Sequence, residues 1–170
     1  MLGHHLGTDE IVAPFGHHAW IYVRNLTNES IYAGALGLEG MQKITVGTWH
    51  STYHDGVWYN MERFYADEFS ETNSVSLVKT LTASELATLN NAITNSSNDK
   101  WNNINNCSWF AAKMWNTVSD YEISPGIIPT PITLRNNMVE NAGATTGLYI
   151  AEDLDVYVGG SDPQIYYIFD

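Results

Sequence analysis

Apolar residues alternate with polar ones along the first third of the chain and recur every three or four positions in its middle. The first pattern is typical of half-buried strands and the second of amphipathic helices. Alternation and β-branched or aromatic content predict strands over residues 18–23, 31–38, 44–49 and 57–64. Asp55-Gly56, just before the last of these, is typical of a tight hairpin turn. The first sixty residues are therefore expected to form an antiparallel meander.

Helices are predicted in the middle of the chain. Residues 82–85 have the spacing of a capping box, and the apolar positions after them predict a helix that frays near residues 95–98. A second helix is predicted over residues 107–119. A third is predicted over residues 131–138, because Thr130-Pro131 supplies a cap and a proline for the first turn. Strands return at residues 147–151, 154–158 and 165–169. This order of elements indicates an α+β fold with a mostly antiparallel sheet.

Composition narrows the domain organisation and the class of partner. A chain of 170 residues with 44% hydrophobic content is expected to fold as one domain over residues 1–170, with residues 1–10 flexible or a remnant of expression. The formal net charge is −12, and nucleic acids and anionic membrane surfaces need basic footprints. We therefore expect neither partner, and no apolar run approaches the length of a membrane-spanning helix.

The start of the chain lacks the basic and apolar regions of a signal peptide. Asn, Thr, Ser, Tyr and Trp are abundant and lysine is scarce, which is typical of secreted bacterial proteins. We therefore expect a secreted or cell-envelope protein of a bacterium, whose signal peptide is absent from this sequence.

Cys107 is the single cysteine, and it lies where an asparagine-rich segment gives way to the second predicted helix. Asn105 or Asn106 can cap that helix, which puts Cys107 in its first turn. Free amides and the helix dipole stabilise an anion there, and the thiolate is the nucleophilic form of cysteine. The alternative is that Cys107 is a small buried hydrophobe.

Histidine is the usual partner of a nucleophilic thiol. His18 opens the first predicted strand and shares a face with Trp20 and Tyr22, whereas His17 points to the opposite face. A histidine at the start of a central strand can reach the N-terminus of a helix packed on that strand. His50 and His54 would form a metal pair only on a helix, and their segment has the pattern of strand and turn, so no metal or other cofactor is expected.

These two segments carry a resemblance to a known family. Residues 16–23, with the sequence Gly-His-His-Ala-Trp-Ile-Tyr-Val, followed later by Asn106-Cys107-Ser108-Trp109-Phe110, resemble the circularly permuted papain-like hydrolases. Their relatives include lecithin retinol acyltransferase-like proteins and NlpC-type cell-wall peptidases. The resemblance covers residues 16–120 and implies a permuted papain-like fold, His18 as the general base, Cys107 as the nucleophile, and a third polar residue that orients the imidazole.

Two residues of the predicted strand 57–64 are candidates for that third position. Glu62 is favoured over Asn60, because a carboxylate stabilises imidazolium whereas an amide only orients it. The chain departs from the family by a long insertion over residues 25–56. Trp20, Asn60 and Trp109 are expected to contact substrate, although large aromatic residues more often belong to a core.

The expected function is a cysteine peptidase or amidase that cleaves an amide through a Cys107 thioester, with a peptidoglycan stem peptide as the leading substrate. Two alternatives stay open. The first is a non-catalytic module that binds a peptide or a glycan in an aromatic cleft. The second is an acyltransferase of the lecithin retinol type, which would need access to lipid.

Overall fold

The computed structural model describes residues 2–10, 17–63, 75–96, 100–140, 143–146 and 155–166, with side chains from His18 onward. Within these residues eight strands form one antiparallel sheet in the order β10-β9-β6-β5-β2-β1-β7-β8. The strands are β1 (Leu2–Glu10), β2 (His17–Asn25), β5 (Lys43–Trp49), β6 (Gly56–Tyr59), β7 (Val75–Leu81), β8 (Thr145–Thr146), β9 (Val156–Val158) and β10 (Gln164–Tyr166). A separate hairpin consists of β3 (Ile31–Ala33) and β4 (Leu36–Leu38).

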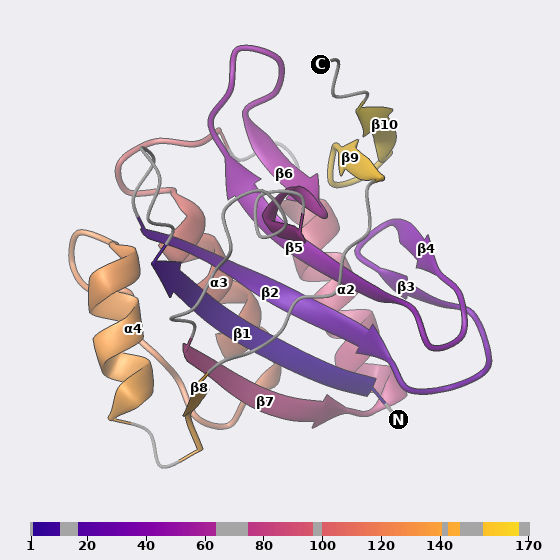
Figure 1. The fold of residues 1–170 in the computed structure, drawn as a ribbon, viewed down its shortest axis with the longest axis horizontal. Helices are drawn as coiled ribbons and strands as arrows, with labels where there is room; N and C mark the ends of the chain where they lie inside the picture. Colours follow the sequence, from indigo (N-terminus) through magenta and orange to yellow (C-terminus); the bar gives the residue numbers. More distant parts are fainter. Residues whose placement is uncertain are drawn as a thin grey trace.

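Three helices of the described chain pack on one face of the sheet: α2 (Ala83–Asn95), α3 (Cys107–Val118) and α4 (Pro131–Val139) (Figure 1). Alternation along β2 explains this layering. Ala19, Ile21 and Val23 are buried in the main core with the apolar side chains of all three helices, whereas Trp20 and Tyr22 form a separate cluster. The α+β class with an antiparallel sheet is therefore confirmed.

The helix boundaries follow the capping residues that the sequence predicts. Thr82 and Glu85 form a reciprocal capping box at α2. Asn106 caps α3, and Thr130 caps α4 with Pro131 in the first turn. None of these helices is long and apolar enough to cross a membrane.

The start of the chain differs from expectation. Residues 1–10 were expected to be flexible, but Leu2–Glu10 forms β1 in the middle of the sheet, between β2 and β7. Leu2–Thr8 pairs on both sides, which gives backbone donors and acceptors of β1 partners in β2 and β7. That stabilisation comes from distant segments, so the local pattern, which contains two glycines, did not reveal it.

Several strand boundaries also differ. The predicted strand 31–38 is interrupted at Gly34, whose φ of +63° allows the tight turn between β3 and β4. Strand β7 was not predicted, because its short apolar run has no clear period. The predicted strand 147–151 lies outside the described residues. The tail otherwise contains β9 and β10, close to their predicted positions.

Candidate active site

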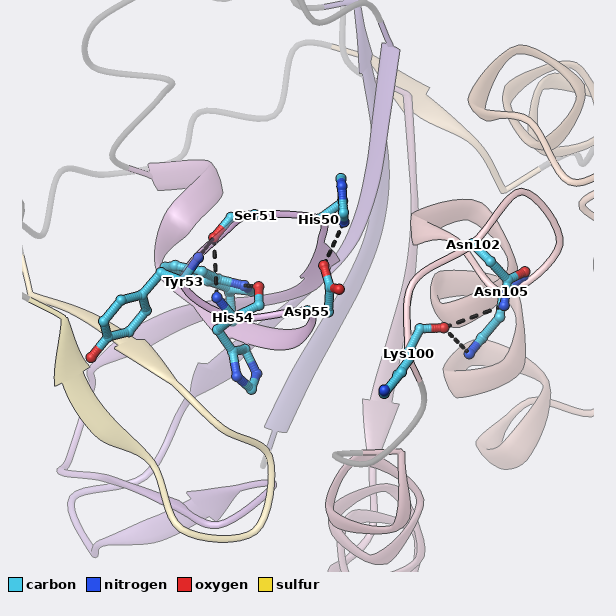
Figure 2. Close-up of polar contacts among 9 residues, drawn as sticks. His50, Ser51, Tyr53, His54, Asp55, Lys100, Asn102 and Asn105 are labelled. Carbon is cyan, nitrogen blue, oxygen red and sulfur yellow. Dashed lines mark hydrogen bonds and ion pairs between the residues drawn. The ribbon is translucent and has the colours of Figure 1, made fainter.

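Helix α3 follows an asparagine-rich loop that its own side chains hold in shape. Asn102 accepts hydrogen bonds from the amides of Ile104 and Asn105 at 2.9 and 2.8 Å. The side-chain Nδ2 of Asn105 in turn donates to the carbonyl of Lys100, as Figure 2 shows. Short amide side chains can replace backbone partners in tight turns in this way. The abundance of asparagine here therefore serves to fold the loop that presents Cys107.

Asn106 fixes the first turn of α3. Its side-chain oxygen accepts from the amides of Ser108 and Trp109 at 3.0 and 3.2 Å. Its Nδ2 donates to the carbonyl of Pro129 at 2.8 Å, which ties the loop before α4 to this end of α3. Cys107 is the first residue of α3, and its side chain is buried at 7% exposure. The thiol therefore lies at a well-anchored helix N-terminus, where negative charge is favoured.

Cys107 meets β2 where the sheet divides. The pairing of β2 with β5 ends at Ile21 and Val46. Beyond that point the backbone amide of Ala19 lies near the Cys107 thiol and lowers its pKa. The imidazole of His18 lies near the same thiol, and each of the two groups shifts the pKa of the other. The end of β2 therefore supplies two groups that stabilise a thiolate.

Glu62 is the third of a set of neighbouring side chains, Cys107, His18 and Glu62, which we call the triad. Its Oε1 accepts from His18 Nε2 at 2.9 Å. Glu62 is 3% exposed and His18 is 6% exposed. A carboxylate on the far side of the imidazole favours the imidazolium form and fixes the orientation of the ring.

The backbone at Glu62 is a correction to the predicted strand 57–64. Strand β6 ends at Tyr59, Asn60 has a φ of +61°, and residues 61–63 are helical. Asparagine tolerates this left-handed conformation better than most residues, and it turns the chain out of the sheet. Glu62 therefore reaches His18 from a helical turn and not from a strand face shared with Asn60.

Two neighbours of Glu62 fasten this turn to β5. Asn60 accepts from the amide of Thr45 at 3.3 Å and donates to the carbonyl of Asp155 at 2.9 Å. Arg63 donates to the carbonyl of Lys43 at 2.5 Å. The Asn60 side chain also borders a polar recess with Lys43 and Asp155, and no triad residue lines that recess. Asn60 thus holds the turn, and in the described structure it does not bond His18.

Two residues of β5 that the sequence analysis did not single out touch the triad. The indole N–H of Trp49 donates to Glu62 Oε1 at 2.8 Å. A β-carbon added at Gly47 would collide with Glu62 Oε1 and lie 3.2 Å from His18 Nε2. Only a residue without a side chain leaves this space to the triad. The available signal was the position of both residues on the strand predicted to follow His18.

The Cys107 thiol and the His18 imidazole shift each other's pKa. Burial lowers the pKa of His18, but the Cys107 thiolate and the Glu62 carboxylate outweigh it and raise that pKa to about 10. Burial raises the pKa of Cys107, but the His18 imidazolium, the Ala19 amide and the Ser108 hydroxyl lower it below its ordinary value. Both shifts favour a thiolate–imidazolium pair over a neutral thiol and imidazole.

The other candidate residues, Trp20 and Trp109, have different surroundings. Trp20 is 1% exposed, so it belongs to the interior beside His18 and not to an open groove. Trp109 is half-buried, and the ammonium of Lys113 lies 4.4 Å from its ring centroid. The side chain of His17 lies outside the described residues. No three His, Cys, Asp or Glu side chains in the described chain gather closely enough to hold a metal ion.

The β5–β6 loop, residues 50–55, meets the loop that leads to Cys107. His50 pairs with Asp55 at 2.5 Å, and Figure 2 shows this pair facing the loop of Lys100, Asn102 and Asn105. The His50 ring also stacks on Trp101, with a centroid distance of 5.5 Å. The two loops that flank the triad are thus in direct contact.

Comparisons with models of protein families, with curated proteins and with solved structures returned no significant match to this chain.

Proposed function

We propose that this protein is a cysteine hydrolase that cleaves an amide bond, with Cys107 as nucleophile, His18 as general acid and base, and Glu62 as the residue that orients His18. The observation that carries the proposal is the triad: Cys107 is the first residue of helix α3 and lies near His18, and His18 is hydrogen-bonded to Glu62. Nucleophile, base and orienting group in this order are the requirement for acyl transfer by a thiol. The order in the chain, His18 before Cys107, agrees with a permuted papain-like arrangement.

The triad assigns each step of the reaction to a group. The Cys107 thiolate attacks the carbonyl carbon, and a C–S bond forms. The His18 imidazolium then gives its proton to the leaving nitrogen as the C–N bond breaks, which leaves a thioester. Neutral His18 next takes a proton from the water that attacks the thioester, and breaking of the C–S bond restores thiolate and imidazolium.

The oxygen of the tetrahedral intermediate needs hydrogen-bond donors. Cys107 is the first residue of α3, and amides at that position have no acceptor within the helix. The Asn106 side chain accepts from Ser108 and Trp109, the next two amides. The amide of Cys107 is therefore the donor best placed for an oxyanion.

A peptide-type amide is the proposed substrate, with peptidoglycan stem peptides as the leading candidate. The net charge of −12 disfavours polyanionic substrates, and the permuted family includes enzymes that cleave short peptides. The test incubates the wild type and Cys107→Ala with purified muropeptides, and in parallel with acyl esters and phospholipids. New amino groups released from muropeptides by the wild type alone would support the proposal.

Other outcomes of that experiment decide between the alternatives. If the wild type but not Cys107→Ala transfers acyl groups from phospholipid, the protein is an acyltransferase and the proposed hydrolase function is wrong. Tight binding of muropeptides by both proteins, without turnover of any compound, would contradict the enzyme and favour a binding module. His18→Ala serves as a second control, because loss of a general base lowers the rate by about 10²–10⁴-fold.

A further inference from the structure

We propose that Trp49 is a positioning residue for the His18–Glu62 pair, holding the carboxylate with its indole N–H and restraining the imidazole with its ring. The proposal rests on the proposed function only in treating His18 as the base. Trp49 contacts both members of this pair and acts through them.

The hydrogen bonds to Glu62 converge on a single oxygen. Oε1 accepts from His18 Nε2 at 2.9 Å and from Trp49 Nε1 at 2.8 Å. The other oxygen, Oε2, is buried and has no hydrogen-bond partner in the described structure. Two donors from different strands fix the direction of Oε1, whereas one donor would leave the carboxylate free to turn about a single bond. Loss of the indole N–H would thus loosen Glu62 itself.

The ring of Trp49 restrains His18 as well. The centroids of the indole and the imidazole are 4.0 Å apart, and their planes are tilted by 34°. The ring of Trp20 is more distant, with its centroid 6.1 Å from that of His18. The closer indole limits rotation of the imidazole and keeps water from its bond to Glu62. A single side chain thus contacts both members of the pair.

Strand pairing at Trp49 and a ring contact of the next residue hold this part of the hairpin in place. Trp49 is the last residue of β5 and pairs with Gly56 of β6. The next residue, His50, stacks on Trp101 in the loop that leads to Cys107. The hairpin that carries Trp49 is therefore anchored to the segment that carries the nucleophile.

An electrostatic consequence follows from the shared oxygen. Without the indole N–H, the carboxylate of Glu62 can turn away from His18 and then gives less support to the imidazolium. His18 should therefore bind its proton less tightly in the absence of the indole N–H. This effect requires Glu62, and it should vanish when Glu62 is already neutral.

The test measures proton binding at His18 by ¹⁵N NMR of the imidazole in the full-length protein. Trp49→Phe keeps an aromatic ring and removes the N–H. The matched control is Trp115→Phe, since the Trp115 indole donates to the carbonyl of Tyr121 at 2.8 Å elsewhere in the fold. We expect Trp49→Phe to weaken proton binding at His18 roughly tenfold, the size expected for a hydrogen bond to a charged group, and the control to leave it unchanged.

A second comparison separates positioning from general damage. In a Glu62→Gln background, Trp49→Phe should cause no further weakening, because the indole acts through the carboxylate. Unchanged proton binding in Trp49→Phe, or equal weakening with and without Glu62, would overturn the proposal. Neither measurement uses a substrate, so absence of turnover would contradict the proposed function without affecting this result.

The wild type provides a check if Trp49→Phe does not fold. The indole N–H of Trp49 should exchange slowly with solvent, and its ¹H resonance should move in Glu62→Gln. Rapid exchange in the folded protein would contradict the proposal.

Discussion

His18 Nε2 donates to Glu62 Oε1 across 2.9 Å, joining the start of β2 to the turn after β6 in a buried part of the molecule. Burial of two ionisable groups is costly, and apolar residues in their place often stabilise a fold as well or better. Stability alone therefore does not explain the pair. Its effect on the Cys107 thiol, whose pKa His18 lowers, is what the proposed function would require.

The first prediction concerns the reactivity of Cys107. Because the thiolate is stabilised by His18 and the Ala19 amide, iodoacetamide should alkylate the folded protein at pH 6–7 faster than the unfolded chain. His18→Ala should slow this reaction near neutral pH, whereas His17→Ala should keep much of the rate. Mass spectrometry of the labelled protein measures both rates. A thiol that reacts only after denaturation would instead indicate a buried hydrophobe.

The second prediction concerns stability against pH. The raised pKa of His18 gives stability that is complete below pH 6.5 and is lost as pH rises to about 10. The lowered pKa of Cys107 gives stability that is complete above pH 9.0 and is lost as pH falls through its folded value. Between pH 6.5 and 9.0, and above the folded pKa of Cys107, the two slopes cancel, because the folded ion pair and the unfolded neutral pair hold the same number of protons.

The contribution of the pair should therefore be flat over that range and fall below and above it. The measurement is the free energy of unfolding of the wild type minus that of a Cys107→Ala, His18→Ala double variant, at a series of pH values. A difference that changes steadily across this window would mean that the folded pair holds a different number of protons from the unfolded one, so that only one of its two members is charged.

Local sequence signals predict the backbone at Cys107 and His18 better than the backbone at Glu62. Helix capping by Asn106 and alternation along β2 are local signals, and they placed Cys107 and His18 at the correct element boundaries. The left-handed turn at Asn60 is local too, but its sequence resembles a continuing strand. Glu62 was therefore assigned to a strand, although its backbone is helical.

The residues that support the triad depend on tertiary contacts. Trp49 and Gly47 had no motif of their own, because their roles arise only when β5 lies beside the end of β2 and the turn at Glu62. Strand β1 was missed for a similar reason, since β2 and β7 supply its partners. Pairing between distant segments leaves little trace in a local pattern.

The third prediction concerns the cap of α3. Asn106→Ala removes the acceptor for two amides and leaves the buried carbonyl of Pro129 without this donor. We expect a loss of about 1–3 kcal/mol in the free energy of unfolding and several-fold slower alkylation of Cys107, because the first turn is less ordered.

Thr82→Ala is the matched control for the cap. It removes the side-chain cap of α2, a helix that does not carry the triad, and should cost about 1 kcal/mol. Alkylation of Cys107 should keep its rate in that variant. Equal slowing in both variants would show that reactivity follows global stability and not the geometry at Asn106.

The last prediction concerns Gly47. A methyl group at this position would collide with Glu62 Oε1 and press on His18 Nε2, and neither atom is free to move, since Trp49 and His18 both hold the carboxylate. Gly47→Ala should therefore destabilise the fold by about 1–3 kcal/mol through overpacking and displace Glu62 from His18. Gly37→Ala is the control, because an added β-carbon there meets nothing within 4 Å and should change stability by less than about 0.5 kcal/mol. Urea unfolding gives the stabilities, and iodoacetamide labelling reports the triad. A Gly47→Ala protein with wild-type stability and labelling would show that the packing around Glu62 is looser than the structure indicates.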